Sequence, residues 1–415
     1  MGIKEIKVTN FKSFKNMEIK LGNFTVLIGA NASGKSNFVQ IFKFLKDLAI
    51  SGLDNAISMQ GGVEYLRNIN IGTSEDFSMQ ITCDHEFGFG VDRWRKGWIG
   101  VKACEGTYEF ALRFRKKKTE FEIAKDVLSL KCKSVKLVGV EKGEIEEKEE
   151  IGEGEIIISR DNKKIKIDIR GSISPSIDKI VPFLREELIP PRMLLIQMPY
   201  TFTFGFRDIL SNISIYDFDP KLPKKATPIT GKAELEEDGS NLSIILKNLV
   251  EDTKNKRRLF NLIKDLLPFI SDLDVEKFAD KSLLFKLKEA YSGKQYIPAS
   301  LISDGTINIT ALIIALFFEK KPLIIIEEPE RNIHPHLISR IIDMMKDASK
   351  EKQIIVTTHN PEVVKYAGLD NLLLISRDQN GFSIVSKPSD EEKVKTFLMN
   401  EIGIEELFVQ NLLGA

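Results

Sequence analysis

The chain carries at residues 29–36 the stretch Gly29-Ala30-Asn31-Ala32-Ser33-Gly34-Lys35-Ser36, which fits the phosphate-loop pattern GxxxxGK[ST] at every position. An apolar segment at residues 24–28 precedes it, and apolar residues at helical spacing follow it as far as Ser51 and Gly52. The pattern therefore predicts a buried strand, a glycine-rich loop and a helix. A chance glycine-rich turn is the alternative, and the flanking strand and helix argue against it.

Each residue type in this loop has a defined use in binding phosphate. Glycines let backbone N–H groups converge on phosphate oxygens, and the positive end of the following helix adds to the attraction. We expect Lys35 to reach the β- and γ-phosphates of a nucleotide and the Ser36 hydroxyl to ligate Mg²⁺. The sequence therefore predicts a nucleotide site at this loop.

A second motif lies far downstream, where the apolar stretch Leu323-Ile324-Ile325-Ile326 ends in Glu327 and Glu328. Glu327 is expected to hold Mg²⁺ through water, and Glu328 to polarise the water that attacks the γ-phosphate. An ordinary acid pair at the start of a helix is the alternative. About 290 residues separate Ser36 from Glu327, yet ligands of one metal must nearly touch. The nucleotide core is therefore predicted to be split, with the middle of the chain inserted into it.

Composition narrows the class of protein. A length of 415 residues predicts two to four domains, or one core with large insertions. Sixty basic and sixty acidic residues cancel, which argues against a histone-like polycation. Three cysteines without CxxC spacing cannot form a disulfide framework. No signal peptide is visible, and the longest apolar stretch, 309–318, is too short to cross a bilayer. We predict a soluble cytoplasmic protein without a membrane partner.

Periodicity changes along the chain. Residues 77–170 show short alternating runs, which are typical of an antiparallel β meander. Residues 175–292 favour helices, among them 180–188, 242–250 and 259–267. From residue 295 onwards strands and helices alternate, which implies a parallel sheet with crossover helices.

Charged and aromatic runs mark the β-rich part. Residues 113–118 are basic, residues 141–155 are acidic, and residues 94–98 interleave two Trp with Arg and Lys. Solvated hairpins explain the charged runs, and an edge strand that packs its two Trp rings explains residues 94–98. The alternative is a nucleic-acid contact, in which the aromatic rings stack on bases.

Several further stretches form an ordered set with the phosphate loop and the acid pair. They are the opening Asn10-Phe11-Lys12-Ser13-Phe14, Asn37 directly after the phosphate loop, Leu301-Ile302-Ser303-Asp304-Gly305, Glu327-Glu328-Pro329-Glu330-Arg331-Asn332-Ile333-His334-Pro335, Val356-Thr357-Thr358-His359-Asn360-Pro361, and the weaker stretches Asp217-Phe218-Asp219-Pro220 and Glu237-Asp238-Gly239-Ser240-Asn241-Leu242. With these motifs the chain resembles the SMC, RecF and OLD-type ATPase heads, a branch of the ATP-binding cassette superfamily. In that family the stretch at 301–305 resembles the degenerate signature, 327–335 the Walker B strand and D-loop, 356–361 the switch-histidine segment, and the two weaker stretches a linker region. The resemblance is firm over residues 1–50 and 296–375, loose over 190–250 and absent over 77–185.

The resemblance implies an α/β P-loop NTPase of the ABC-head type. We expect a stand-alone head without a coiled coil, and a description as an AAA-family ATPase would fit it. Its mixed sheet with crossover helices would carry an antiparallel β insertion and a helical lobe. The expected domains are the Walker A part of the ATPase core at 1–76, the β-rich insertion at 77–185, the mostly helical lobe at 186–295, and the rest of the core at 296–415.

The resemblance also implies that two heads dimerise head to tail around two ATP molecules with Mg²⁺. Each ATP would lie between the phosphate loop of one subunit and the signature of the other. The expected site residues are Glu328 and His359 for catalysis; Ser36 and Glu327 for the metal; and Asn31, Ala32, Ser33, Gly34, Lys35, Ser36, Asn37, Lys12, Gln197, Ser303 and Gly305 for the nucleotide.

This chain departs from the family pattern at several positions. Glu327 stands where Asp is usual, and Asp304 replaces the first Gly of the transporter signature, which argues against a transporter ATPase. Gln197, after the strand-like residues 193–196, is the best candidate for the γ-phosphate-sensing glutamine, and Lys12 is a candidate for contact with phosphate or adenine. Too few residues follow His359 for a Toprim nuclease domain, so nuclease activity would require a separate partner.

Three roles remain open for such a slow ATPase. The first is a DNA-associated motor or clamp in repair. The second is the ATPase of an anti-phage defence system, paired with a separately encoded nuclease or toxin. The third is a nucleotide-gated scaffold that binds ATP and hardly hydrolyses it.

Overall fold

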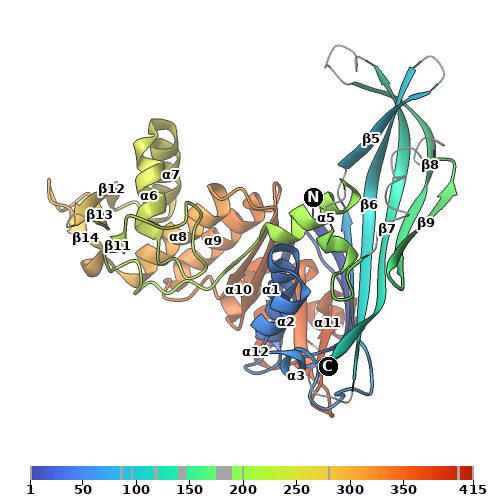
Figure 1. The fold of residues 1–415 in the computed structure, drawn as a ribbon. Coiled ribbons are helices and arrows are strands. Elements are labelled where there is room, and N and C mark those ends of the chain that lie inside the picture. The colour runs from blue at the N-terminus through green and yellow to red at the C-terminus, as the bar shows by residue number, and fades with distance from the viewer. Residues whose placement is uncertain are drawn as a thin grey trace. The chain divides into compact units, whose positions relative to one another are not determined.

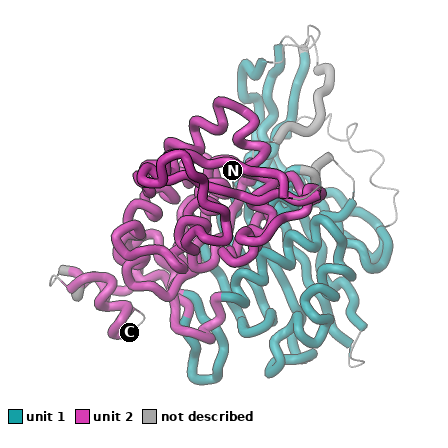
Figure 2. Tube along the Cα trace, turned by 90° about the vertical axis from the view of Figure 1, so that its left-hand side faces the viewer, with its two compact units in different colours: residues 1–22, 36–212, 376–385 teal, residues 23–35, 213–375, 386–415 magenta. Residues whose placement is uncertain are grey.

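The computed structural model describes residues 2–84, 87–94, 97–115, 120–138, 146–173, 189–198, 201–278, 281–399 and 402–413. The helix expected at 180–188 and the lysines at 116–118 lie outside these residues. The chain forms two compact units (Figure 2). Unit 1 comprises residues 1–22, 36–212 and 376–385, and unit 2 comprises residues 23–35, 213–375 and 386–415.

Unit 1 is built on one antiparallel sheet, whose long strands are drawn side by side in Figure 1. Its order is β2-β1-β4-β6-β7-β8-β9, and β5 also pairs with β6. The antiparallel meander expected over 77–170 is therefore confirmed. The strands are β1 (Gly2–Phe11), β2 (Phe14–Lys20), β4 (Phe77–Asp84), β5 (Phe87–Trp94), β6 (Gly97–Phe114), β7 (Phe121–Val138), β8 (Glu146–Asp161) and β9 (Lys164–Gly171).

An aromatic cluster joins this sheet to helix α1. The ring of Phe44 on α1 lies 5.7 Å from that of Phe77 and 6.4 Å from that of Phe110. Helix α1 ends before Gly52, whose φ of 86° is one that a side chain would disfavour, as its sequence position predicted. The helices of unit 1 are α1 (Lys35–Ser51, whose first residue belongs to unit 2), α2 (Leu53–Met59), α3 (Val63–Leu66), the 3₁₀ helix η3 (Leu195–Gln197) and α5 (Thr201–Ser211).

Unit 2 contains the parallel sheet that the C-terminal alternation predicted. Strands β10, β15, β16, β3 and β17 lie in this order, with every neighbouring pair parallel. Strand β3 is buried at all five positions, as its apolar sequence requires. The bounds are β3 (Phe24–Ile28), β10 (Ile213–Tyr216), β15 (Leu323–Glu327), β16 (Gln353–Thr358) and β17 (Leu372–Arg377). The short β18 (Ser383–Ser386) belongs mostly to unit 1.

Helix α8 is the central helix of unit 2. Every residue from Thr306 to Leu316 is buried, as expected for a helix that carries apolar residues around most of its circumference. The helices of this unit are α6 (Leu242–Glu251), α7 (Thr253–Leu266), η4 (Ala299–Leu301), α8 (Asp304–Phe317), α9 (Pro335–Ala348), α10 (Pro361–Ala367), η5 (Leu369–Asn371), η6 (Pro388–Asp390), α11 (Glu392–Met399) and α12 (Ile404–Val409).

A second, small sheet of unit 2 differs from the mostly helical lobe that was expected. Strands β12 (Ile270–Phe278) and β13 (Ser282–Glu289) form an antiparallel hairpin, joined by β11 (Thr227–Pro228) and β14 (Ile297–Pro298). Leu283, Phe285 and Leu287 are buried while their neighbours are half-buried, which is the period of a strand. The helices expected at 242–250 and 259–267 are present as α6 and α7.

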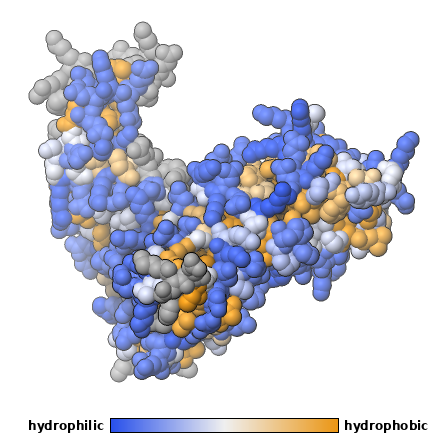
Figure 3. All heavy atoms as spheres, turned by 180° about the vertical axis from the view of Figure 1, so that it is seen from behind, coloured by the Kyte–Doolittle hydropathy of each residue, from blue (hydrophilic) through white to orange (hydrophobic). Residues whose placement is uncertain are grey.

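The face shown in Figure 3 is mostly hydrophilic, with hydrophobic residues gathered in a few patches. Among the described residues, no helix is long and apolar enough to cross a membrane. The three cysteines carry free thiols, two of them buried.

Candidate nucleotide-binding site

A segment near the N-terminus, residues 24–35, and a segment of the C-terminal part, residues 323–359, meet at the carboxyl ends of the strands in the parallel sheet of unit 2. Strand β16 lies between β15 and β3, with Glu327 paired to Thr357 and Thr358 paired to Ile28. The phosphate loop follows β3, His359 follows β16, and Glu328 follows β15. All three segments therefore leave the sheet at the carboxyl ends of its strands, where open α/β sheets bind ligands.

The phosphate loop has the compact backbone that its glycines suggested. A Cβ atom at Gly29 would collide with the carbonyl oxygen of Ile375 and the hydroxyl of Ser33. Ala32 and Gly34 have φ angles of 62° and 121°, so the backbone turns sharply before helix α1. Within the loop the N–H of Ser33 donates to the carbonyl of Ala30 at 3.2 Å, and helix α1 begins directly after Gly34, so the N-terminus of a helix lies at the end of the loop.

The Lys35 ammonium folds back over this loop. It donates to the carbonyl oxygens of Gly29 at 2.7 Å and Ala30 at 3.0 Å. Burial lowers the pKa of Lys35, and the negative charge of Glu328 acts against that shift. The charge of the loop lysine is therefore coupled to that of Glu328.

Glu328 is held on both carboxylate oxygens. Its Oε1 atom lies 2.8 Å from Nδ1 of His359, and its Oε2 atom accepts a hydrogen bond from Arg331 at 3.2 Å. The backbone of Glu328 has a φ of 46°, which is uncommon for a residue with a side chain, and its N–H donates to the carbonyl of Thr357 at 2.8 Å. The turn after β15 thus aims this carboxylate at the segment that follows β16.

A cavity of about 10 Å³, close to what one water molecule needs, adjoins the acid pair. Asn308 of helix α8 lines it, and its Oδ1 atom is buried without a hydrogen-bond partner among the described residues. The remaining lining residues are Phe218, Leu312, Glu327, Glu328 and Pro329.

The signature segment lies against the D-loop. Ser303 caps helix α8 by accepting from the backbone N–H of Thr306 at 3.2 Å. A Cβ atom at Gly305 would come within 2.5 Å of the carbonyl oxygen of Asn332, so a side chain does not fit there. The His334 side chain caps helix α9 by accepting from the backbone N–H of His336 at 3.4 Å.

Four predicted nucleotide residues belong to unit 1. Ser36 and Asn37 follow Lys35 in the first turn of α1, and the Asn37 amide donates to the Ser13 hydroxyl at 2.8 Å. Lys12 has a φ of 46°, and burial lowers the pKa of its ammonium. The strand expected at residues 193–196 is not observed, because η3 forms there instead. Within it, the Gln197 side chain accepts from the N–H of Leu194 at 2.9 Å, so it closes the turn locally.

The structure places three further residues beside the acid pair that no sequence motif had marked as functional: Glu330, Arg331 and Asp217. Glu330 is buried, and its carboxylate accepts from the Thr358 hydroxyl at 2.5 Å. Burial raises the pKa of Glu330, and the hydrogen bond from Thr358 acts against that shift. Arg331 bridges Glu328 and Asp217. All three residues stand in the stretches that carried the resemblance, but their contacts depend on the fold.

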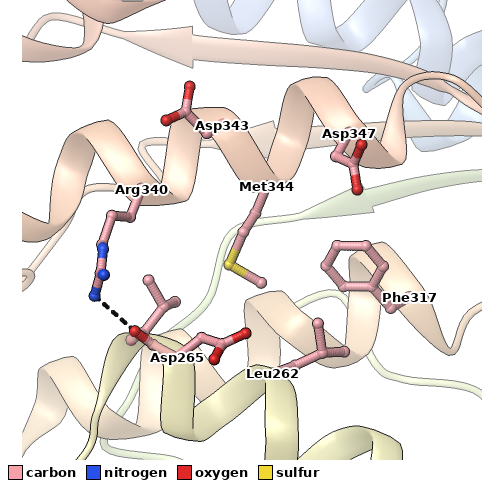
Figure 4. Close-up of a pocket in the computed structure, with 8 residues that line it drawn as sticks. Leu262, Asp265, Phe317, Arg340, Asp343, Met344 and Asp347 are labelled. Atoms are coloured by element: carbon pink, nitrogen blue, oxygen red, sulfur yellow. Dashed lines mark hydrogen bonds between the residues drawn. The ribbon is translucent and has the colours of Figure 1, made fainter.

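A separate open groove of about 560 Å³ runs between helices α7 and α9 (Figure 4). Arg340 donates across it to the carbonyl oxygen of Asp265 at 2.7 Å. None of the predicted site residues lines this groove, whose walls are Leu262, Asp265, Leu266, Phe317, Arg340, Asp343, Met344 and Asp347.

Solved structures with a similar fold are SMC head domains. The SMC head bound to the C-terminal winged-helix domain of ScpA matches with a TM-score of 0.50 and 18% identity over 93% of this chain and 98% of that chain. The SMC head with an extended coiled coil from Pyrococcus furiosus, bound to the C-terminal domain of ScpA, has a TM-score of 0.47 and 18% identity, covering 97% and 100%. The head from Thermotoga maritima has a TM-score of 0.40 and 15% identity, covering 93% and 99%.

Two family descriptions match the sequence, while no curated protein does. Residues 1–180 match the family described as AAA ATPase domain. Residues 153–365, half of the chain, match the second family. The phosphate loop, the acid pair and the SMC-head fold agree with both descriptions. The chain therefore belongs to the AAA ATPases, in the family described as AAA domain, putative AbiEii toxin, Type IV TA system.

Proposed function

We propose that this protein binds ATP with Mg²⁺ and hydrolyses it slowly. The observation that carries the proposal is the meeting of the phosphate loop, the Glu327–Glu328 pair and His359 at one sheet edge, with His359 at 2.8 Å from Glu328. The tight turn at Gly29 and the oxygen donors Ser36 and Glu327 suit a magnesium–triphosphate, because Mg²⁺ in such sites takes a few protein oxygens together with phosphate oxygens.

Each residue has one task in the proposed reaction. Lys35 binds the β- and γ-phosphates, while Ser36 and Glu327 hold Mg²⁺, which neutralises charge on the phosphate oxygens when bound. Glu328 accepts the proton of the water that attacks the γ-phosphate. His359 holds Oε1 of Glu328 and directs its other ring nitrogen toward the γ-phosphate. Glu327 is one methylene longer than the usual Asp, and it would hold Mg²⁺ through a water molecule.

ATP-dependent dimerisation is the second part of the proposal. Ser303 and Gly305, at the positive end of helix α8, meet the γ-phosphate bound by a second copy of the chain. The neighbouring Leu301 exposes 76% of its surface, and an apolar side chain at this position suits a face that a second copy covers.

The proposed dimerisation controls a DNA-associated activity of the repair or anti-phage defence type. The family description, which names a putative toxin of a type IV TA system, favours the defence role. A separately encoded toxin or nuclease partner belongs to the proposal and is not named by that description. The basic run gives less support to direct DNA binding than its sequence suggested. Arg113 pairs with Asp76 at 3.1 Å and Arg115 pairs with Glu122 at 2.9 Å, so acids neutralise both.

The alternative function is a nucleotide-gated scaffold, a regulatory subunit with little hydrolysis or DNA binding. The observation that favours the scaffold is that both carboxylate oxygens of Glu328 already have partners, Arg331 on Oε2 and His359 on Oε1. Single-turnover hydrolysis with and without duplex DNA separates the two functions. A scaffold would retain intact ATP in both conditions, whereas the proposed ATPase cleaves it.

Dimerisation is tested by light scattering of a Glu328→Gln protein, which should bind ATP and fail to release the dimer. Adding Mg²⁺ and ATP should double its mass, and a Leu301→Lys change in the same background should prevent the doubling. Tyr291→Lys, another exposed apolar residue of unit 2, is the matched control and should still dimerise. A monomer in the Glu328→Gln protein at saturating ATP would contradict the dimer model.

A further inference from the structure

Arg331 joins the proposed general base to an acid from a distant part of the chain. Its Nη2 atom donates to Oε2 of Glu328 at 3.2 Å, and its Nη1 atom donates to Oδ1 of Asp217 at 2.9 Å. Asp217 lies 114 residues before Arg331, directly after strand β10. The planar guanidinium thus spans the carboxyl ends of two neighbouring strands, β10 and β15.

The backbone holds both ends of this bridge. The N–H of Arg331 donates to the carbonyl of Glu328 at 3.0 Å, and its own carbonyl accepts from the Asn308 amide at 2.8 Å. The N–H of Asp217 donates to the carbonyl of Glu237 at 2.9 Å. These hydrogen bonds hold the backbones of Arg331 and Asp217. The position of the Arg331 guanidinium therefore depends on its side-chain contacts with Glu328 and Asp217.

Each carboxylate oxygen of Glu328 has a different partner, His359 on Oε1 and Arg331 on Oε2. Each carboxylate oxygen has a second lone pair, so the group can still accept a proton from water. Two fixed hydrogen bonds leave the carboxylate one orientation, and a general base must lie within hydrogen-bond reach of its proton. We propose that Arg331 is a positioning residue for Glu328 and that Asp217 holds Arg331 in place. This inference rests on the proposed ATP hydrolysis.

The solvent exposure of Arg331 and Asp217 distinguishes a positioning role in hydrolysis from a role in folding stability alone. The side chains of Arg331 and Asp217 are 40% and 56% exposed. Exposed ion pairs contribute little to folding stability. Loss of the bridge should therefore change the rate of hydrolysis while the protein stays folded.

The test compares Arg331→Ala, Arg331→Lys and Asp217→Asn with the wild type in steady-state ATP hydrolysis and in thermal unfolding. Arg331→Ala should lower kcat about tenfold to a hundredfold, with the KM for ATP and the melting temperature nearly unchanged. Arg331→Lys, which keeps the charge and loses the fork, should fall in between. Asp217→Asn should lower kcat less, and it should add nothing in the Arg331→Ala background. Arg340→Ala, on helix α9, is the matched control.

Two outcomes overturn the inference. One is an Arg331→Ala protein whose kcat equals or exceeds that of the wild type. A higher kcat would mean that Arg331 restrains the general base instead of positioning it. The other is independent, additive effects of Arg331→Ala and Asp217→Asn. Glu328→Gln, measured in parallel, distinguishes the two levels of the proposal. If it retains turnover, Glu328 is not the base and the proposed mechanism fails; if it loses turnover while Arg331→Ala does not, the positioning role alone fails.

Discussion

The Nδ1 atom of His359 lies 2.8 Å from the Oε1 atom of Glu328, across 31 residues of sequence. The two residues follow adjacent parallel strands, β16 and β15, whose register brings their ends level. A histidine that contacts a carboxylate in this way orients it and keeps its own ring in place. This pair is therefore the most informative contact for testing the proposed chemistry.

Replacing His359 with Ala should slow hydrolysis and leave ATP binding intact. The change removes the partner of Oε1 in Glu328 and the group proposed to reach the γ-phosphate, so kcat should fall about tenfold to a hundredfold. Steady-state kinetics with a separate ATP-binding measurement checks this. His336→Ala, at an exposed histidine on α9, is the control. Equal turnover in the two variants would remove His359 from the mechanism.

Replacing Lys35 with Ala should act on binding. The ammonium is proposed to pair with the β- and γ-phosphates, and in this structure it donates to two loop carbonyls instead. Affinity for ATP should fall at least about tenfold, as expected for the loss of a charge-assisted contact. Titration with a fluorescent ATP analogue measures the effect, with the exposed Lys294→Ala as control. Unchanged affinity would place the triphosphate elsewhere.

A substitution at Gly305 should destabilise unit 2. The added Cβ of Gly305→Ala would come within 2.5 Å of a backbone carbonyl, that of Asn332, which cannot turn away as a flexible side chain can. Overpacking of this kind costs about 1–3 kcal/mol. Urea unfolding monitored by circular dichroism should show the loss. A variant as stable as the wild type would mean that the signature helix and the D-loop can separate freely.

Asp126 should make stability depend on pH. It is buried, accepts hydrogen bonds from the Tyr108 hydroxyl and the Leu195 N–H, and burial raises its pKa to about 7. Since the folded state binds the proton more tightly than the unfolded state, the stabilisation is present at low pH and is lost as pH rises towards 7.

The measurement compares wild type with Asp126→Asn, which is neutral and can still accept from Leu195. Between pH 5 and pH 8 the free energy of unfolding of the wild type should fall by up to ~3 kcal/mol more than that of the variant. Urea titrations across this range supply both curves. Parallel curves would show that the Asp126 carboxyl does not titrate in this window.

The local structure around the phosphate loop and the acid pair was largely predictable, because the pattern that encodes each of them is local in sequence. The loop at residues 29–36 needs a strand before it and a helix after it, and the apolar pattern on each side supplies both. Glu327 and Glu328 end an apolar run, which placed them at the carboxyl end of a buried strand. Parallel pairing then follows from the alternation of strands and helices.

The contacts of Arg331 were not predictable, because they depend on strand order. Asp217 approaches Arg331 only because β10 pairs with β15, and no local pattern encodes that neighbour. The hairpin of β12 and β13 was missed for a different reason. Its apolar residues were grouped with the helical pattern that ends at Leu266, although Leu283, Phe285 and Leu287 alternate with period two.

Phosphate release from ATP and Mg²⁺ by the purified protein, with Glu328→Gln alongside, tests the central claim most directly. We expect slow turnover by the wild type, a loss of about a hundredfold or more in Glu328→Gln, and ATP binding in both. Glu276→Gln, at an exposed acid of strand β12, should match the wild type. Glu328→Gln that releases phosphate at the wild-type rate would contradict the account.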